Sequence, residues 1–236
     1  MNIPHPLGIL APSQSALEGV DPKFVRAGIF AARDKTIAAF EAIKSLLKEG
    51  MMEEDGRKLG LQVFADLGVQ KHWHTPHVRF GSGTTLNFSS SVKTDHRLTA
   101  GDACYIDLGP IWNDPQYDLA YEGDYGDSFV FGENAEAAHC GDVCRKLFAE
   151  AKTAWKDHAI TGLAIYEMLK QRASEEGFQL LEEVGGHRIG DFPHHRFTKS
   201  NLSHFAFIPT SSLWILEVQI IDPKNRFGAF FEDILE

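Results

Sequence analysis

The sequence is poor in cysteine, in basic residues and in long apolar runs. Its 236 residues include three cysteines, an odd number with no Cys-x-x-Cys spacing, which argues against a disulfide framework or a paired-thiol redox site. No apolar run approaches the roughly 20 residues that a membrane-spanning helix needs. Lys and Arg number 23 against 33 Asp and Glu, and the formal charge of −10 argues against nucleic acid or an anionic membrane as the main partner.

The N-terminal segment also lacks the features of a secretory signal. It has no basic stretch, and Pro4, Pro6 and Pro12 interrupt it. Together with the few cysteines, this predicts a cytoplasmic protein. Residues 1–22 show no periodicity that would bury them, so we expect an extended arm. Its apolar residues could cover a second copy of the chain, which would make the protein a homodimer. Residues 23–236 are long enough for a single large domain.

Apolar residues recur at helical spacing in four segments, which predicts four amphipathic helices. These segments are residues 23–47, 53–67, 135–159 and 160–176. Strands are expected in residues 78–92, around a Gly-rich turn, and in residues 180–184, 205–209 and 213–221. The order is helix, helix and hairpin, repeated once. We therefore expect an α+β fold of two halves about a pseudo-twofold axis.

The first hairpin is the segment from Tyr105 to Gly132, in which two apolar runs are joined by a polar, turn-rich stretch. The arms carry Asp107 and Asp124 where strand alternation points a side chain inward. A buried carboxylate is costly unless it is paired or binds a metal. Such a pair alone is a weak signal, because strand aspartates more often cap turns or lie at a surface edge.

The second hairpin strengthens the signal. Glu217 lies within a run of large apolar residues, a turn follows at residues 222–225, and Glu232 lies on the returning strand. Four inward carboxylates in one dry pocket would repel one another and take up protons. Two divalent cations would balance their charge, so the two hairpins predict a dinuclear metal centre.

His187 is the candidate nitrogen ligand between the hairpins. It stands in the string GGHRIG, whose glycines allow the backbone to approach a site closely. A neutral imidazole is a good ligand for first-row divalent ions. Oxygen-rich ligation with one imidazole suits Mn, Fe(II), Co or Zn, and the choice among them is open.

These residues, in this order, resemble the metal ligands of the pita-bread metallopeptidases of peptidase family M24, which include methionine aminopeptidase, Xaa-Pro dipeptidase (prolidase) and creatinase. The matching strings are YIDLGP, EGDYGDSFVFG, GGHRIG, WILEVQI and GAFFEDIL. The resemblance covers about residues 23–236. It implies a pita-bread fold, with an antiparallel sheet and outer helices in two pseudo-symmetric halves, and a peptide-hydrolysing enzyme with two divalent metal ions.

The resemblance also implies a role for each ligand. Asp124 and Glu232 would bridge the two ions, Asp107 would chelate one of them, and His187 with Glu217 would complete the other. The bridging water would be acidified, and the ions would clamp the attacked carbonyl. Glu217 would carry the proton from this water to the leaving amine.

Two histidines are candidates for contact with the substrate. His194, seven residues after His187, resembles the histidine that hydrogen-bonds the substrate carbonyl in the family; otherwise it is a solvent-facing loop residue. Many members have a second histidine before the first ligand, but here that position falls near residues 86–89, which have none. His77 could reach the pocket instead, although with His72 and His74 it could equally form a surface cluster.

The second aspartate ligand has alternatives in the sequence. The interval from Asp107 to Asp124 is longer than is usual in the family, so the string WNDPQYDLAY is read as an insertion at the rim of the site. Asp118 and Asp127 are therefore alternatives. Asp124 is preferred because it keeps the family distance to the glycine that ends the second arm.

The leading interpretation is a metallo-aminopeptidase or dipeptidase that cleaves an Xaa-Pro or methionyl bond at the N-terminus of a short peptide. A hydrolase of a non-peptide C–N bond, as creatinase is, is the second reading, although creatinase-like members generally lack the full ligand set. A catalytically silent binding protein on the same fold is the third. The retained ligands argue against it, whereas the insertion and the missing histidine keep it open.

Overall fold

The computed structural model describes residues 16–87, 90, 95–116, 119–190 and 198–236. The helices are α2 (Arg26–Leu46), α3 (Glu53–Asp66), α4 (Ala135–His158) and α5 (Gly162–Glu175), with short 3-10 turns at Gly81–Thr85 and Leu202–His204. The strands are β1 (Lys71–His72), β2 (His77–Phe80), β3 (Asp102–Leu108), β4 (Pro110–Asp114), β5 (Leu119–Glu122), β6 (Tyr125–Phe131), β7 (Gln179–Leu180), β8 (His187–Arg188), β9 (Trp214–Ile221) and β10 (Gly228–Ile234). The four predicted helices are therefore present.

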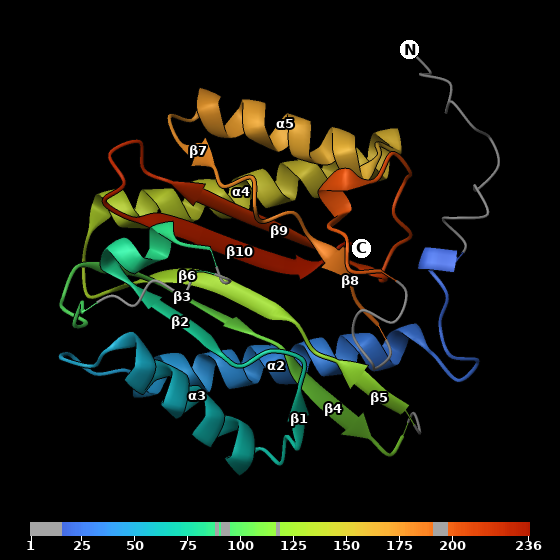
Figure 1. Cartoon of the computed structure of the whole chain (residues 1–236), viewed down its shortest axis with the longest axis horizontal. Helices are drawn as coiled ribbons and strands as arrows, with labels where there is room; N and C mark the ends of the chain where they lie inside the picture. Colours follow the sequence, from blue (N-terminus) through green and yellow to red (C-terminus); the bar gives the residue numbers. More distant parts are fainter. Residues whose placement is uncertain (1–15, 88–89, 91–94, 117–118, 191–197) are drawn as a thin grey trace.

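A central antiparallel sheet joins two similar halves (Figure 1). Its strand order is β2-β3-β6-β10-β9-β7, with β8 also paired to β9. Helices α2 and α3 accompany the half that contains β2 and β3, and α4 and α5 accompany the half that contains β9 and β10. The predicted helix–helix–hairpin repeat is thus a spatial one, and the two halves meet where β6 pairs with β10.

Strand alternation separates the apolar side chains from the acidic ones. The side chains packed in the helix-side cores include Cys104, Ile106 and Leu108 of β3, Leu216, Val218 and Ile220 of β9, and Ala229 of β10. Because successive side chains of a strand point to opposite faces, Asp107, Glu217 and Glu232 point to the face away from the helices. We call this second face the open face.

The join between the two halves depends on a side-chain hydroxyl. In the β6–β10 ladder only Glu232 and Gly126 are in register. Further along, the buried Ser128 hydroxyl donates to the Phe230 carbonyl at 2.9 Å and accepts from the Phe230 amide at 2.7 Å. Ser128 therefore supplies both hydrogen bonds that a partner strand's backbone would otherwise make.

The polar stretch between the arms of the first hairpin forms a small sheet of its own. Strands β4 and β5 pair with each other, and β1 joins the free side of β4 through Lys71 opposite Ile111. Trp112 of β4 anchors this inserted sheet to α2, because its indole N–H donates to the Thr36 hydroxyl at 2.9 Å. The stretch that was predicted to be turn-rich and to contain an insertion therefore holds two paired strands.

One strand prediction was wrong, because residues 205–209 form no strand. The predicted Gly-rich turn after β2 is a 3-10 turn over Gly81–Thr85, and most of the strand predicted after it lies outside the described residues. Phe205 and Phe207 instead stack on each other, with ring centroids 4.9 Å apart, and both contact Trp214. The alternating aromatic residues that pack on Trp214 have the spacing of a strand, although they do not form one.

The described part of the N-terminal segment is fastened to the C-terminal half. The Glu18 carboxylate accepts hydrogen bonds from the Trp214 indole at 2.7 Å and from the Thr210 amide at 2.8 Å. Arg188 donates to the Gly19 carbonyl. Among the described residues, every helix is too short or too polar to span a lipid bilayer.

We predict that Ser128→Ala destabilises the protein by about 1–3 kcal/mol, because it leaves the amide and carbonyl of Phe230 buried without partners. Urea denaturation of the metal-free protein measures this change. Ser45→Ala is the matched control, since that exposed hydroxyl only bonds its own helix. Equal stability of the two variants would mean that Ser128 does not hold the halves together.

Candidate metal centre

Four carboxylates meet on the open face at the join between the halves. Glu217 of β9 lies directly opposite Glu232 of β10. Gly126 of β6 lies opposite both Asp107 and Glu232, so these two side chains approach each other across a residue that has no side chain. A Cβ at Gly126 would lie 2.8 Å from Glu232 Oε1 and 2.5 Å from the Phe230 ring. The carboxylates can therefore converge only because residue 126 is glycine.

The carboxylates are almost completely shielded from water. Asp124 and Glu232 are 1% exposed, Asp107 5% and Glu217 6%. Burial raises the pKa of Asp124, of Glu217 and especially of Glu232, whose neighbours Asp124 and Asp107 add repulsion. Without cations the site must therefore hold protons, and the Glu232 carboxyl shares a hydrogen bond with Asp107.

His187 faces Asp124 from β8. Its Nε2 lies 2.9 Å from Asp124 Oδ2, and its Nδ1 lies 3.0 Å from the Arg188 carbonyl oxygen. A carbonyl can only accept, so Nδ1 carries a proton and Nε2 is the atom directed at the carboxylate. Although burial disfavours the charged ring, hydrogen bonding to Asp124 and the charge of Asp124 raise the pKa of His187 to about 10.

His74 faces Asp107 in a similar way. Its Nε2 lies 3.1 Å from Asp107 Oδ1, and its ring stacks on that of His77 with centroids 4.9 Å apart. Burial would raise the pKa of Asp107, but the facing His74 outweighs this and holds the pKa well below its usual range. Burial lowers the pKa of His77, which favours its neutral form. His77 itself lies opposite Asp107 in the β2–β3 ladder.

Glu217 is oriented by the loop before β8. The Gly186 amide donates to Glu217 Oε2 at 2.7 Å, and Gly186 has a φ of +65°, a conformation that favours glycine. The Tyr166 hydroxyl of α5 donates to the backbone carbonyl of Glu217 at 2.9 Å. The GGHRIG string thus holds one carboxylate and also presents His187.

The residues present fit divalent cations. Both oxygens of Asp124 and Oε1 of Glu232 are buried, and apart from the His187 ring at 2.9 Å from Asp124 Oδ2 they have no hydrogen-bond donor among the described residues. Asp124, His187 and Glu232 offer ligand atoms within 4.8 Å of one another, and so do His74, His77 and Asp107. Carboxylate oxygens with imidazole nitrogens are ligands of first-row divalent ions. Buried acceptors that lack hydrogen bonds are what a cation would satisfy.

The other predicted positions are distributed as follows. Asp127, an alternative for the second ligand, points to the helix side and pairs with Arg145 of α4 at 2.8 Å. Asp118 and His194 lie outside the described residues. Near the expected upstream histidine, the Leu86 carbonyl accepts hydrogen bonds from the Tyr105 hydroxyl and the Gln219 amide.

The sequence reasoning did not single out Trp73 and His74. Trp73 lies between the two histidines, with its ring centroid 4.1 Å from that of His74 and 5.0 Å from that of His187. His72, the last residue of β1, is exposed. The sequence of the three clustered histidines does not distinguish the half-buried His74 from the exposed His72.

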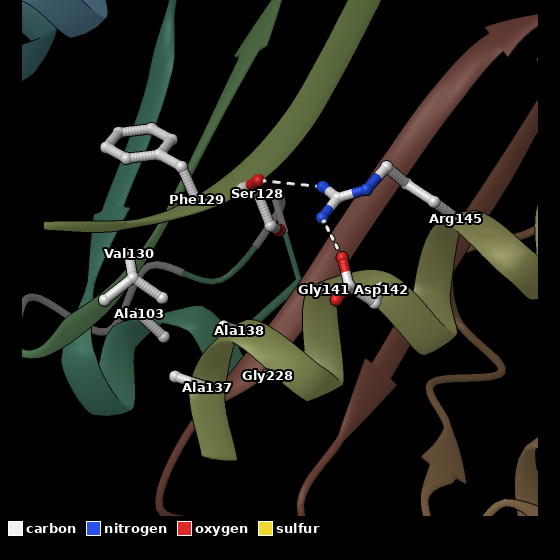
Figure 2. Close-up of a pocket in the computed structure, with 10 residues that line it drawn as sticks. All are labelled: Ala103, Ser128, Phe129, Val130, Ala137, Ala138, Gly141, Asp142, Arg145 and Gly228. Atoms are coloured by element: carbon white, nitrogen blue, oxygen red, sulfur yellow. Dashed lines mark hydrogen bonds and ion pairs between the residues drawn. The ribbon is translucent and has the colours of Figure 1, made fainter. Parts of the chain in front are cut away.

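A cavity of about 140 Å³ lies elsewhere, between α4 and the helix side of the sheet (Figure 2). Ser128, Gly228 and small residues of α4 line it. Its charged lining residues are Asp142 and Arg145, and Arg145 donates hydrogen bonds to Asp142 and to the Ser128 carbonyl. This cavity is separate from the carboxylate cluster, which faces the opposite side of the sheet.

The model of Metallopeptidase family M24 matches residues 27–236 of this chain. No curated protein matches the chain significantly.

Solved structures show the same fold at low identity. Prolidase from Pyrococcus horikoshii is 17% identical with a TM-score of 0.66, and the match covers 87% of this chain and 57% of that one. X-Pro aminopeptidase from Thermotoga maritima is 16% identical with a TM-score of 0.70, over 94% of this chain and 63% of that one. Methionine aminopeptidase from T. maritima is 16% identical with a TM-score of 0.60, over 96% and 98%. The predicted pita-bread fold is confirmed.

We predict that Gly126→Ala weakens metal binding by about 10–100-fold, the usual effect of displacing a ligand through its surroundings. The new methyl group would push the Glu232 carboxylate and the Phe230 ring out of place. Isothermal titration with Co(II) measures the affinity. Gly141→Ala in α4 is the control, because there the methyl group would meet only the Arg145 side chain, at 3.3 Å. Unchanged affinity in Gly126→Ala would contradict the geometry.

We predict that the metal-free protein loses thermal stability as pH rises from about 5 to about 9. Asp124, Glu217, Glu232 and His187 have raised pKa values, so the folded state binds more protons than the unfolded state in this range. The lowered pKa of Asp107 contributes stability that is constant there and is lost only at lower pH.

Melting curves with chelator and with excess Zn(II) or Co(II) check this. A bound metal replaces the protons, so the loaded protein should melt at a higher temperature, and the difference should grow with pH. A metal-free midpoint that rises between these pH values would contradict the assigned cluster.

Proposed function

Because this chain belongs to Metallopeptidase family M24, as the resemblance predicted, we propose that it is a metal-dependent aminopeptidase or dipeptidase that hydrolyses an N-terminal peptide bond. The observation that carries the proposal is the convergence of Asp107, Asp124, Glu217 and Glu232 with His187 on the open face. Buried acids placed together at such electrostatic cost are expected where cations bind.

The five side chains would hold two divalent ions, with Asp124 and Glu232 shared between them. Asp124 lies against His187 and Glu232 lies against Asp107, so each of the central acids adjoins one of the other predicted ligands. The ions, when bound, would acidify a water molecule and polarise the carbonyl under attack. We propose Mn, Co, Fe(II) or Zn as the metal, because the donors are oxygens with imidazole nitrogen.

Glu217 is proposed as the group that moves the proton. The Gly186 amide holds Oε2, and burial with neighbouring acids raises the pKa of Glu217. A carboxyl whose pKa is raised can accept a proton from water and return it to the leaving amine. His194, for which the family resemblance is the support, is proposed to hydrogen-bond the substrate carbonyl. His77 is proposed to contact the substrate from β2.

The substrate class is drawn from two kinds of relative. Prolidase and X-Pro aminopeptidase favour a bond before proline, whereas methionine aminopeptidase favours a methionyl bond. The chain spans only 57% and 63% of the first two proteins but 98% of the third. We therefore propose a short peptide with a free N-terminus as the substrate, and treat the residue preference as the quantity to be measured.

Location and assembly are further parts of the proposal. The three cysteines, Cys104, Cys140 and Cys144, are free and buried, which supports a reducing cytoplasm. A homodimer through the N-terminal segment and a single domain over residues 23–236 are proposed from the sequence.

The test is release of free amino acid from a panel of X-Ala, X-Pro and Met-X peptides by protein loaded with Mn, Co or Zn. We predict turnover with a defined preference, and a loss of about 10²–10⁴-fold in kcat for Glu217→Gln. Glu183→Gln is the control, because Glu183 lies on the exposed loop before the site.

The outcomes separate the alternatives. Two bound ions without cleavage of any peptide would contradict the peptidase and point to a non-peptide amide substrate. Failure to take up Mn, Co or Zn would contradict the enzyme and leave a binding protein on the same fold. Full activity of Glu217→Gln would contradict its role in proton transfer.

A further inference from the structure

The second metal position has an imidazole that the predicted ligand set does not contain. Of the five predicted ligands, only His187 supplies nitrogen, and it lies on the Asp124 side of the cluster. On the Asp107 side, His74 Nε2 lies 3.1 Å from Oδ1 of that residue. Asp107 and Asp124 therefore each face one histidine.

The hydrogen bonding of His74 directs a lone pair at the site. Its Nδ1 lies 2.7 Å from the Thr75 carbonyl oxygen, which can only accept, so Nδ1 is the protonated nitrogen of the neutral ring. Nε2 is then the nitrogen directed at the Asp107 carboxylate, and the neutral ring would offer the lone pair of this atom to an ion held there. His187 has the same arrangement, with Nδ1 bonded to the Arg188 carbonyl. Anchoring one ring nitrogen on a carbonyl is the usual support of a metal-bound histidine.

The inserted sheet is what places His74 there. Strand β1 pairs with β4, and the next amide, that of Trp73, donates to the Gly109 carbonyl at 2.9 Å. The Trp73 indole donates to the Gly123 carbonyl at 3.3 Å. Gly109 lies just after Asp107 and Gly123 just before Asp124, so the pair Trp73–His74 is held by the backbone on both sides of the site.

Gly109 leaves the space that the two rings occupy. A Cβ at this position would lie 2.3 Å from His74 Cδ2 and 2.5 Å from Trp73 Nε1. The His74 ring is therefore packed tightly against the strand end that carries Asp107. A ring held in this way has little freedom to turn toward solvent, and its orientation is preorganised.

We propose that His74 is a nitrogen ligand of the ion held by Asp107, so that each of the two ions has one imidazole. This inference rests on the proposed metal centre and adds a ligand to it. Imidazole favours Zn, Co and Ni over Mn, which prefers oxygen. The second position should therefore select Zn or Co more strongly than an all-oxygen position would.

The test is metal binding by the full chain, measured without any substrate. Equilibrium dialysis with Zn(II) and with Mn(II) gives the stoichiometry and both affinities for wild type, His74→Ala, His74→Gln and His77→Ala. His72→Ala is the matched control, since that histidine lies two residues earlier, in β1, but is exposed. X-ray absorption of the two-zinc wild type counts imidazoles per zinc, a readout that does not depend on any variant.

We expect two zinc ions in wild type and in His72→Ala, with about one imidazole per zinc. His74→Ala should bind the second zinc about 10–100-fold more weakly, with a smaller loss for Mn. His74→Gln, which offers an amide oxygen, should recover Mn binding more than Zn binding. Circular dichroism of the metal-free variants shows whether each is folded.

Three results would overturn the inference. They are about half an imidazole per zinc in wild type, an equal loss of Zn and Mn affinity in His74→Ala, or loss of the second zinc in His77→Ala alone. The first two would make His74 a support of Asp107 rather than a ligand. Wild type that binds no zinc or manganese would instead contradict the proposed function itself.

Discussion

Mutual repulsion among four buried carboxylates is the constraint on which the rest of this structure depends. Water hardly reaches Asp107, Asp124, Glu217 and Glu232, so each carboxylate that is ionised raises the free energy of ionising the next one. The fold supplies partial relief through His74 and His187, which face the two aspartates. Two divalent cations would remove the repulsion, and this is why the site is best understood as a metal centre.

Small residues and an inserted sheet allow the charges to be brought so close. Gly126 lets Asp107 and Glu232 approach each other across β6, and Gly109 leaves room for the ring of His74. The β4–β5 insertion binds β1 along its edge and thereby holds Trp73 and His74 beside the cluster. A segment that interrupts the first hairpin thus becomes part of the wall of the site.

Much of this could be predicted from local patterns. Helical periodicity located all four helices, and strand alternation correctly pointed Asp107, Glu217 and Glu232 to one face. The pairing of β1 with β4 could not be predicted, because it joins two short segments through long-range contacts and its sequence has no alternation. His74 was therefore indistinguishable from His72. The strand predicted at residues 205–209 was wrong for another reason. The aromatic rings of this segment pack on Trp214, and its backbone does not pair with another strand.

The most direct test of this account is anomalous diffraction, at the zinc or cobalt edge, from crystals of the metal-loaded protein. The account predicts two strong peaks on the open face of the sheet, one within ligand distance of Asp107 and one within ligand distance of His187, with Asp124 and Glu232 between them. A single peak away from this cluster, or no peak at all from protein saturated with metal, would contradict it.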